Sequence, residues 1–414
     1  MAPEDIHAVV RLGAAGDGVV DVAGAPVYVA GVLPGEQVAL GDGVPRRVGS
    51  TVSPDRRLQP LCSHVERCGG CALQHMTDAA YRNWKPTLLT NALRTQGLDV
   101  ALQPMISAPL DSRRRAVLAV RRSGDDIALG FHGRRSSEVE NLLDCAILTS
   151  RIVAALPGLR ALASMLLPAK LETHVTVIET SAGLDVAFAA GRAELAPGER
   201  HRITEAVARQ RLARLSVAGD IFVAYGEPVL AISGVAVVPP PGAFLQAAQQ
   251  SEQAMAAIAA GAARKAKRVA DLFAGLGTFT FALARQAQVL AIDSDRSLID
   301  ALTHAARKAQ GLKPIEAKVR DLFLDPLSPR ELDTFDLVVF DPPRAGAKAQ
   351  AEQLAKSKVR TVVAVSCNPA TLARDLRTLV GGGYGITSIT PVDQFLFTPH
   401  LEAVAVLERP RAPR

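Results

Sequence analysis

The stretch from Val359 to Leu376 constrains the fold of this chain more than any other. Residues Thr361–Ser366 are uncharged and β-branched or small, a run that is too short for a helix and typical of a strand buried on both faces. Asn368 and Pro369 then form a turn and begin a helix. This pattern predicts a parallel sheet, and it places Cys367 at the carboxyl end of a strand, where open α/β sheets bind ligands.

From about Gln246 the sequence alternates between predicted strands and helices, which indicates a parallel sheet with helices on both faces. Strands are expected at residues 269–273, 289–292, 336–340, 361–366, 385–390 and 403–407. Their order predicts a Rossmann-like sheet with an added terminal hairpin.

With 414 residues, the chain is too long for a single core. We expect an all-β barrel at residues 1–57, a mixed α/β domain at 58–245 and the Rossmann-like domain at 246–410. Within the mixed domain, hairpins are predicted at residues 114–131, 172–189 and 221–232. The basic, Pro-rich end from Arg409 is expected to be disordered.

The charged residues favour a polyanionic partner. The chain has 47 Lys and Arg against 41 Asp and Glu, and its arginines cluster at residues 113–115, 121–122 and 134–135, in and beside the first predicted hairpin. A solvated face explains such clusters as well as a partner does, if charge alone is considered.

The amino-terminal residues lack the basic and apolar regions of a signal peptide, and no apolar run is long enough to span a bilayer. We therefore predict a cytoplasmic protein that has no membrane partner. No residue pattern reports the oligomeric state, and a monomer is the working expectation.

Residues 5 to about 55 are rich in Val and Gly, with short alternating runs separated by turn residues. This pattern predicts the small all-β barrel. The order G-D-G-V-V, V-Y-V-A-G-V-L-P-G-E-Q-V and S-P-D-R resembles the TRAM domain, an OB-like module that binds RNA. A barrel of the same type without a ligand is the alternative.

The cysteines need an explanation other than a disulfide framework, because there are five of them. Cys62, Cys68 and Cys71 lie close together, and the glycines at 69 and 70 let the backbone approach a metal or cluster. A fourth ligand is needed, and Cys145 is the candidate outside the crevice.

Four thiolates suit either an iron–sulfur cluster or a zinc ion. Zinc sites of this kind usually pair two C-x-x-C knuckles, and only one such knuckle is present here. His64 and His75 lie nearby, but a hydrogen-bonding or surface role is the preferred interpretation for each. Three ligands close in sequence and one far away would tie two segments of the chain together.

The motif D-L-F-A-G-L-G at Asp271–Gly277 suits a nucleotide-type cofactor, because Gly275 and Gly277 let the backbone approach the ligand between a strand and a helix. Asp293, at the end of the second strand, would accept hydrogen bonds from a ribose diol. Only two glycines are present, which favours S-adenosylmethionine over NAD. Asp321 lies where the third strand should end and suits an adenine amino group, with a helix cap as the alternative.

The motif D-P-P-R at Asp341–Arg344 resembles the fourth motif of methyltransferases, whose variants often serve amino-group methylation. A nitrogen methyltransferase, however, would not need a nucleophile at Cys367. Uracil C5 is a weak nucleophile, and a thiolate added at C6 makes an enolate whose C5 can attack a methyl group. A base must then remove the C5 proton. Glu402 is the carboxylate we expect there; His400 competes, although a surface or hydrogen-bonding histidine is the preferred interpretation.

The chain resembles the bacterial RNA uracil-C5 methyltransferases over almost its whole length, and most closely the 23S ribosomal RNA branch that carries an iron–sulfur cluster. The resemblance rests on the TRAM-like barrel, C-x5-C-G-G-C with a distant cysteine, D-L-F-A-G-L-G, D-P-P-R-A-G, V-S-C-N-P-A-T-L-A-R-D and H-L-E. The last two motifs are highly specific. Cytosine-C5 enzymes instead place a cysteine in or beside a Pro-Cys in the fourth motif, and none occurs between Cys145 and Cys367.

The resemblance implies a role for individual residues. Cys367 would be the nucleophile and Glu402 the base. Contacts with S-adenosylmethionine or the target base would come from Gln246, Phe273, Gly275, Gly277, Asp293, Asp321 and Asp341. A [4Fe-4S] cluster would be held by Cys62, Cys68, Cys71 and Cys145. RNA would be the substrate, 23S rRNA in the first place, with its phosphates held by the barrel and the arginine-rich hairpin.

Two positions depart from the family. Ala248 and Thr278 stand where an asparagine is often found, shortly after the F-x-Q glutamine and just after the G-x-G. A threonine hydroxyl can still donate a hydrogen bond, so these departures bear on substrate choice more than on cofactor binding. A tRNA uracil-C5 methyltransferase and a non-catalytic RNA-binding or assembly protein are the alternatives.

Overall fold

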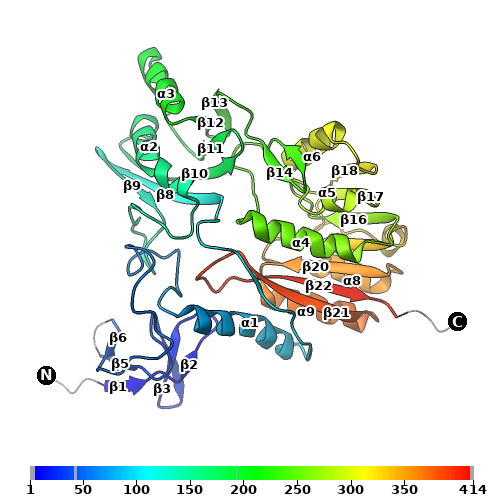
Figure 1. The fold of residues 1–414 in the computed structure, drawn as a ribbon, viewed down its shortest axis with the longest axis horizontal. Helices are drawn as coiled ribbons and strands as arrows, with labels where there is room; N and C mark the ends of the chain where they lie inside the picture. Colours follow the sequence, from blue (N-terminus) through cyan, green and yellow to red (C-terminus); the bar gives the residue numbers. More distant parts are fainter. Residues whose placement is uncertain (1–4, 42–43, 193, 411–414) are drawn as a thin grey trace.

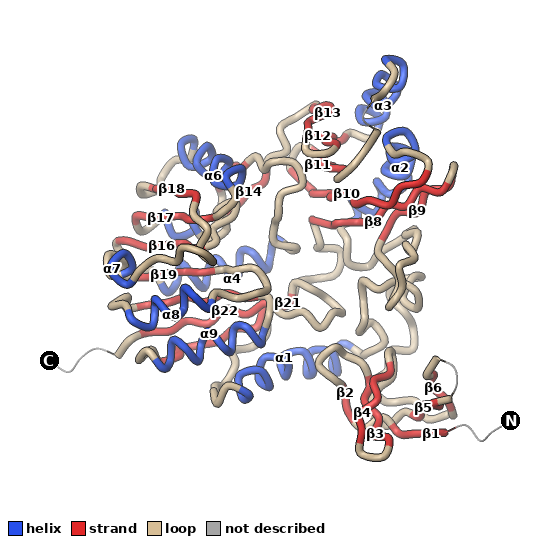
Figure 2. Tube along the Cα trace, turned by 180° about the vertical axis from the view of Figure 1, so that it is seen from behind, coloured by secondary structure: helices blue, strands red, loops and turns tan. Residues whose placement is uncertain are grey.

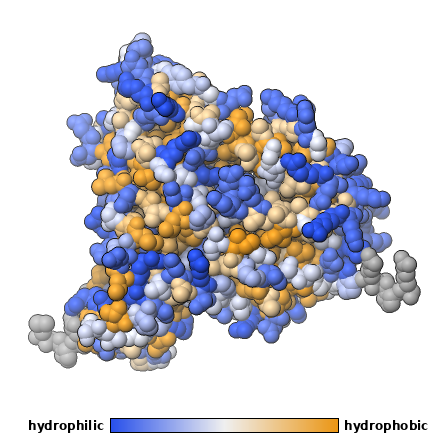
Figure 3. Space-filling model, viewed as in Figure 1, coloured by the Kyte–Doolittle hydropathy of each residue, from blue (hydrophilic) through white to orange (hydrophobic). Residues whose placement is uncertain are grey.

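The computed structural model describes residues 5–41, 44–192 and 194–410, and it contains a small β unit, a central sheet and a large sheet (Figure 1). The expected disorder from Arg409 falls mostly on residues outside these ranges. Within them, no helix has the length and apolarity needed to cross a membrane. Hydrophilic and hydrophobic residues are interspersed over the face shown in Figure 3.

The small β unit at the amino terminus consists of two three-stranded sheets, β1-β5-β6 and β2-β3-β4. Its strands are β1 (Asp5–Ala8), β2 (Arg11–Leu12), β3 (Gly18–Val22), β4 (Ala25–Val29), β5 (Gln37–Leu40) and β6 (Arg46–Val48). Five buried valines form its core: Val9, Val20, Val29, Val32 and Val38. Because these side chains leave water, the unit has an apolar core of its own, as the Val-rich alternating runs predict.

The central sheet has six strands in the order β13-β12-β11-β10-β8-β9. Its elements are β8 (Arg115–Ser123), β9 (Asp126–Gly130), α2 (Ser150–Leu166), β10 (Lys170–Thr180), β11 (Gly183–Phe188), α3 (Pro197–Arg209), β12 (Leu212–Val217) and β13 (Asp220–Ala224). The hairpins β8–β9 and β10–β11 confirm the first two predicted hairpins. Helix α2 packs its buried leucines against this sheet.

The third predicted hairpin, at residues 221–232, is wrong. Strand β13 turns back onto β12, and β14 (Leu230–Ile232) pairs instead with β15 (Val235–Val237). Each true turn has two residues with positive φ, Ala218-Gly219 and Ser233-Gly234. Turns of this kind match the twist of antiparallel strands, and each contains one glycine that tolerates a positive φ.

The large sheet has eight strands in the order β18-β17-β16-β19-β20-β22-β21-β7. Its strands are β7 (Ile106–Ser107), β16 (Arg268–Leu272), β17 (Gln288–Asp293), β18 (Ile315–Val319), β19 (Leu337–Phe340), β20 (Thr361–Ser366), β21 (Gly385–Asp393) and β22 (Glu402–Glu408). Strands β16 to β20 pair in parallel, whereas β22 runs antiparallel to both β20 and β21. The predicted Rossmann-like sheet with a terminal hairpin is confirmed.

Helices cover both faces of the large sheet (Figures 1 and 2). The core on one face contains Val362 and Ala364 of β20, and the core on the other contains Val363 and Val365. Helices α1 (Asp78–Thr95), α8 (Lys348–Lys356) and α9 (Pro369–Gly381) contribute to the first core, and α4 (Gln249–Ala262) and α5 (Thr280–Ala284) to the second. All six residues of β20 are buried, as the apolar run predicts.

The large sheet also uses residues that precede Gln246. Helix α1 packs against α9 through Leu89 and Leu93, both buried in the first core. Strand β7 pairs in parallel with the end of β21 and extends the edge of the sheet. The segment that follows the three clustered cysteines is therefore built into the large sheet.

Candidate active site

Cys367 and Glu402 lie side by side at the carboxyl end of the parallel strands of the large sheet. Cys367 directly follows β20, and Glu402 begins β22. Ser366 pairs with Ala403 in the antiparallel ladder between these strands, so the two predicted catalytic residues are neighbours although they lie 35 positions apart in sequence. Both stand at the carboxyl end of the parallel strands, where this type of sheet binds ligands.

Burial controls the proton affinity of both groups. Burial and, to a smaller extent, the nearby carboxylate of Asp341 raise the pKa of Glu402 to about 8. Burial likewise raises the pKa of the Cys367 thiol to about 11, with Glu402 and Asp341 adding to the effect and Arg344 opposing it. The Oε2 atom of Glu402 is buried and has no hydrogen-bond partner among the described residues. This oxygen is therefore available to take a proton from a ligand.

A chain of side-chain amides joins Glu402 to Asp341. Gln394 Nε2 donates hydrogen bonds to Glu402 Oε1 (3.1 Å) and to Gln246 Oε1 (2.6 Å). Gln246 Nε2 in turn donates to Asp341 Oδ2 (3.1 Å). Burial raises the pKa of Asp341 to about 7, so this chain connects two carboxyl groups that hold their protons unusually strongly.

The predicted cofactor loop follows β16 in a conformation that side chains rarely adopt. Phe273 has a φ of 63°, and Gly275 and Gly277 also have positive φ. A Cβ atom on Gly277 would lie 2.6 Å from the ring of Phe281, so only glycine fits there. The Gly275 N–H donates to Asp293 Oδ2 (2.9 Å), which links the loop to the end of β17.

Asp321 and Asp271 are two further carboxylates near the ends of these strands, and each accepts a hydrogen bond within the protein, Asp271 from the Thr280 hydroxyl. Asp321 Oδ1 accepts hydrogen bonds from the N–H groups of Phe323 (2.9 Å) and Leu324 (3.3 Å), so it caps its own turn, as the alternative interpretation predicts. The rings of Phe273 and Phe323 lie 5.4 Å apart, between the first and third strand ends. Asp271, which begins the motif, is fully buried, and burial raises its pKa to about 7.

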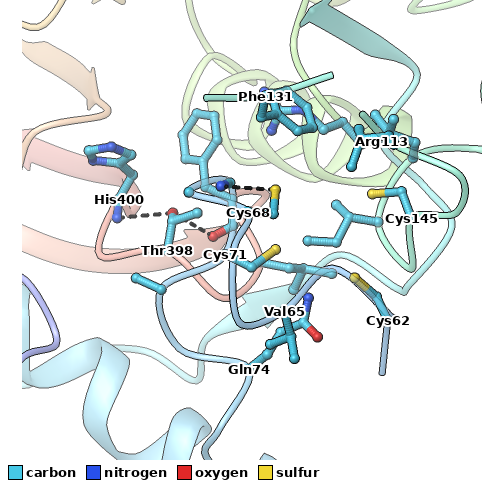
Figure 4. A pocket seen from close by; sticks show the side chains of 18 of the residues that line it. Cys62, Val65, Cys68, Cys71, Gln74, Arg113, Phe131, Cys145, Thr398 and His400 are labelled. Carbon is cyan, nitrogen blue, oxygen red and sulfur yellow. Dashed lines mark hydrogen bonds between the residues drawn. The ribbon is translucent and has the colours of Figure 1, made fainter. Parts of the chain in front are cut away.

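The four remaining cysteines line one cavity of about 370 Å³. Figure 4 shows the sulfur atoms of Cys62, Cys68, Cys71 and Cys145 around a common space. Burial raises the pKa of the Cys62, Cys68 and Cys71 thiols, that of Cys71 to about 12. Other residues complete the lining, among them Arg113 from the loop before β8, and Arg344 and His400 from loops at the carboxyl end of the large sheet.

Two features bring these cysteines together. Gly69 lies against the segment that follows β9, and a Cβ atom there would lie 2.7 Å from the carbonyl oxygen of His132. His64 is buried; its Nδ1 lies 2.7 Å from Glu140 Oε1, and its Nε2 accepts a hydrogen bond from the Leu143 N–H (2.9 Å). The histidine therefore joins the first cysteine segment to the segment that carries Cys145, which fits the predicted hydrogen-bonding role.

The sulfur atoms do not converge on one point. In the ranges that the structure covers, no group of three or more His, Cys, Asp or Glu side chains is placed to hold a single metal ion. In a [4Fe-4S] cluster, by contrast, each cysteine binds a different iron, so the thiolates surround the cluster rather than meet.

Comparisons with known proteins agree with this geometry. A family model for tRNA (Uracil-5-)-methyltransferase matches residues 238–410. An uncharacterized RNA methyltransferase of Brucella suis is 44% identical over 97% of this chain and 97% of its own length. The 23S rRNA (uracil(1939)-C(5))-methyltransferase RlmD of Chromohalobacter salexigens is 33% identical over 99% of this chain and 90% of its own length. The chain belongs to the S-adenosylmethionine-dependent RNA uracil-C5 methyltransferases. The resemblance seen in the sequence is confirmed.

A solved relative of this methyltransferase has the same fold. The tRNA (uracil-54, C5)-methyltransferase of Pyrococcus abyssi, solved with S-adenosyl-L-homocysteine, superposes with a TM-score of 0.74. The match covers 97% of this chain and 99% of that structure at 23% identity. The overall arrangement of this uracil-C5 methyltransferase is therefore that of a solved protein.

The hairpin arginines of this methyltransferase, which the sequence predicts to hold RNA phosphates, have hydrogen-bond partners within the protein. Arg114 is buried and donates to Glu252 Oε2 (2.8 Å). Arg121 bridges two carboxylates of the central sheet and its flanking loop, and Arg122 donates to backbone carbonyls at the end of α2. Other protein groups accept hydrogen bonds from Arg115, Arg134 and Arg135. The prediction is wrong for Arg114, whose side chain is buried; for Arg121 and Arg122, which are partly exposed, it stays a prediction.

Sequence reasoning missed two residues of the methyltransferase crevice. Gln394 is 2% exposed and bonds to Glu402, but a glutamine inside an apolar run carries no recognisable signal. Arg344 ends the D-P-P-R motif and its charge lowers the pKa of both Cys367 and Glu402. The sequence shows Arg344 within the motif. Its neighbours Cys367 and Glu402, however, lie at the ends of other strands that only the fold brings close to it.

Proposed function

We propose that this methyltransferase transfers a methyl group to C5 of a uridine in RNA, with Cys367 as the nucleophile and Glu402 as the base. The observation that carries the proposal is the pairing of Ser366 with Ala403, which sets the thiol beside a buried carboxylate. The unpaired Oε2 atom of Glu402 supports it, because a base needs a free oxygen facing the reacting atom.

The reaction requires the following steps. The Cys367 sulfur adds to C6 of the uracil, and the electrons of the C5–C6 double bond move toward the O4 carbonyl as an enolate. C5 then attacks the methyl group of S-adenosylmethionine and releases S-adenosylhomocysteine. Glu402 Oε2 removes the proton from C5, the C5–C6 double bond re-forms, and the bond from C6 to sulfur breaks. Arg344 favours the thiolate, because its charge lowers the pKa of Cys367.

The cofactor would lie across the ends of β16 to β19. Its contacts are proposed for Gln246, Phe273, Gly275, Gly277, Asp293, Asp321 and Asp341. The positive φ values of the loop support this, because they let backbone N–H groups face a ligand without obstruction by a Cβ atom. When bound, S-adenosylmethionine supplies an electrophilic methyl group.

A [4Fe-4S] cluster is proposed for Cys62, Cys68, Cys71 and Cys145. The arrangement of the four sulfurs around one cavity supports a site with four thiolate ligands. The single C-x-x-C knuckle favours a cluster over a zinc ion. Three thiols with raised pKa, two of them buried, would be stabilised as thiolates by iron, and Arg113 in the cavity lining would face the negative charge. The cluster would tie the segment before α1 to the segment after β9.

The substrate favoured here is 23S rRNA. The support is the 33% identity, over nearly the whole chain, to a relative named for that RNA. The second candidate is tRNA, supported by the name of the matching family model. In either RNA the uridine must leave its stack, because neither face of C5–C6 is accessible within a duplex. The proposed place of action is the cytoplasm, and the proposed active form is a monomer.

The substrate assignment is tested by mass-spectrometric mapping of 5-methyluridine in 23S rRNA and tRNA from cells with and without the gene. Loss of one rRNA position on deletion is expected. Loss confined to tRNA would overturn the substrate and keep the reaction. An unchanged pattern in both RNAs would contradict the proposed function.

The covalent mechanism is tested with two variants. Cys367→Ala is expected to abolish turnover and leave RNA binding intact, so normal methylation would exclude the adduct. Glu402→Gln is expected to accumulate a protein–RNA adduct that survives denaturing electrophoresis, since the C5 proton stays in place. Full turnover by Glu402→Gln would remove Glu402 from the role of base.

A further inference from the structure

Gln394 directly follows β21 and begins the loop that leads to Glu402. Its side-chain amide makes three hydrogen bonds. Its Oε1 accepts from the Ala247 N–H (2.9 Å). Its two amide hydrogens point to Gln246 Oε1 (2.6 Å) and Glu402 Oε1 (3.1 Å). The side chain is 2% exposed, so water does not compete for these contacts.

The backbone fixes the direction of this amide. The Ala247 N–H can only donate, so the oxygen of Gln394 must face it and the NH₂ group must face the other way. Rotation of the amide by 180° would set an N–H against the Ala247 N–H and an oxygen against the Glu402 carboxylate. Gln394 therefore presents a fixed N–H donor to Glu402 Oε1.

The loop backbone around Gln394 is also held in place. The neighbouring residue Asp393 is fully buried and accepts hydrogen bonds from Lys85 and from the Tyr81 hydroxyl (2.6 Å). Lys85 also donates to the carbonyl oxygen of Phe395 (2.8 Å). Helix α1 thus anchors the residues on both sides of Gln394.

We propose that Gln394 is a positioning residue that holds Glu402 Oε1, so that Oε2 faces the substrate and removes the C5 proton. This inference rests on the proposed function, because it assigns the step that follows methyl transfer. A carboxylate held through one oxygen has lost the freedom to rotate its second oxygen away from the reacting atom. Gln394 therefore acts through Glu402 and does not itself touch the uracil.

The proton balance of the step is simple. The C5 proton moves to Glu402 Oε2, the electron pair of the C5–H bond forms the C5–C6 double bond, and the C6–S bond breaks to return the Cys367 thiolate. Burial and Asp341 oppose the ionisation of the base, whereas the Gln394 N–H and Arg344 favour it; Cys367 also lies beside it. Loss of the amide donor would leave Glu402 protonated up to a higher pH.

The test uses Gln394→Met, which keeps an unbranched side chain of similar volume and removes all three hydrogen bonds. The matched control is Gln350→Met: Gln350 is also a buried glutamine, it bonds to the backbone of Leu327, and it lies on α8 away from the crevice. A single turnover is followed with RNA that carries tritium at C5 of uridine and with methyl-labelled S-adenosylmethionine. Methyl transfer and tritium release then report the two steps separately.

In Gln394→Met we expect tritium release to slow about a hundredfold, as expected for a misplaced base, and methyl transfer to slow much less, by the loss of the hydrogen bond to Gln246 Oε1. The methylated adduct should accumulate, and the pH midpoint of tritium release should move upward. Gln350→Met should leave both steps unchanged. Equal slowing of both steps, or no slowing of release, would overturn the inference.

A second variant guards against misfolding. Gln394→Glu keeps the size and the acceptor for the Ala247 N–H, but places an oxygen where the N–H faced Glu402, so slow release is expected again. If neither variant folds, the amide is a structural group and the inference fails. If wild-type enzyme forms no adduct and releases no tritium, the proposed function fails instead.

Discussion

Glu402 binds its proton more tightly in the folded protein than in the unfolded chain. Burial raises its pKa from 4.5 to about 8, so between these values the folded state binds more protons. The stability contributed by this group is complete below pH 4.5 and is lost as the pH rises through about 8. A base kept in a buried crevice therefore costs stability at the pH where it is ionised.

We predict that Glu402→Gln flattens this pH dependence. Removal of the titrating group should reduce the fall in unfolding free energy between pH 6 and 8 by up to about 1.4 kcal/mol per pH unit. Chemical denaturation at several pH values in that range measures it. Glu352→Gln, on the exposed face of α8, serves as the control. If the unfolding free energy of Glu402→Gln fell with pH as steeply as that of the wild type, the raised pKa of Glu402 would be contradicted.

Gly69 permits a close approach that no other residue would. A Cβ atom there would lie 2.7 Å from the His132 carbonyl oxygen, so Gly69→Ala must push the cysteine segment away from the segment after β9. On the proposed [4Fe-4S] cluster, we predict that purified Gly69→Ala contains much less iron and has much weaker visible absorbance than the wild type. Gly261→Ala, in α4 with nothing within 4 Å of the new methyl, is the control and should keep its iron. Full iron content in Gly69→Ala would refute the argument.

Among the elements, helix α1 is joined to β21 by an ion pair between fully buried groups. Lys85 and Asp393 are both 0% exposed, and Lys85 also donates to the Tyr81 hydroxyl (2.7 Å). We predict that Lys85→Met lowers the unfolding free energy by about 3–5 kcal/mol, because it leaves a buried carboxylate unpaired. Urea denaturation measures the change.

Two further variants test whether the loss of stability comes from the buried, unpaired carboxylate or from the removal of any surface ion pair. Lys85→Met combined with Asp393→Asn should recover part of the loss, since no unpaired charge then remains. Lys318→Met breaks an exposed pair with Glu316 and should change stability by less than about 1 kcal/mol. If Lys85→Met lowered the unfolding free energy no more than Lys318→Met does, burial of the Lys85–Asp393 pair would contribute nothing to its stabilising effect.

The sequence predicted a strand or helix correctly where the burial of its own residues is enough to specify it. The β20 run is apolar because both of its faces are covered, and its strand and following helix were readable without any partner. The third hairpin failed because β12 pairs in parallel with β11 across α3, and β13 then pairs with β12. That pairing depends on contacts between distant segments, which local periodicity does not report.

At the scale of the whole molecule, the site could be predicted only in part. Cys367, Glu402 and the cofactor loop stand at strand ends, so their motifs showed where they would meet. The arginines could not be assigned by charge, because Arg114 finds its partner Glu252 at a distance of 138 residues in sequence. The contacts of Gln394 likewise join residues from three separate stretches of the chain.

The large sheet depends on residues outside the segment that carries the catalytic motifs. The family model matches residues 238–410, whereas α1 and β7 come from residues 78–107. Without them, the apolar face of α9 and the edge of β21 would be exposed to water. The matched segment should therefore not fold by itself.

We predict that a fragment of residues 238–414 is insoluble or lacks cooperative unfolding when it is expressed alone. Co-expression with a fragment of residues 1–237 should restore a soluble complex, because α1 and β7 can then dock onto α9 and β21. Gel filtration of both preparations measures complex formation, and thermal unfolding measures whether each unfolds cooperatively. Cooperative unfolding of the isolated fragment at the temperature of the intact chain would mean that the sheet is complete without α1 and β7.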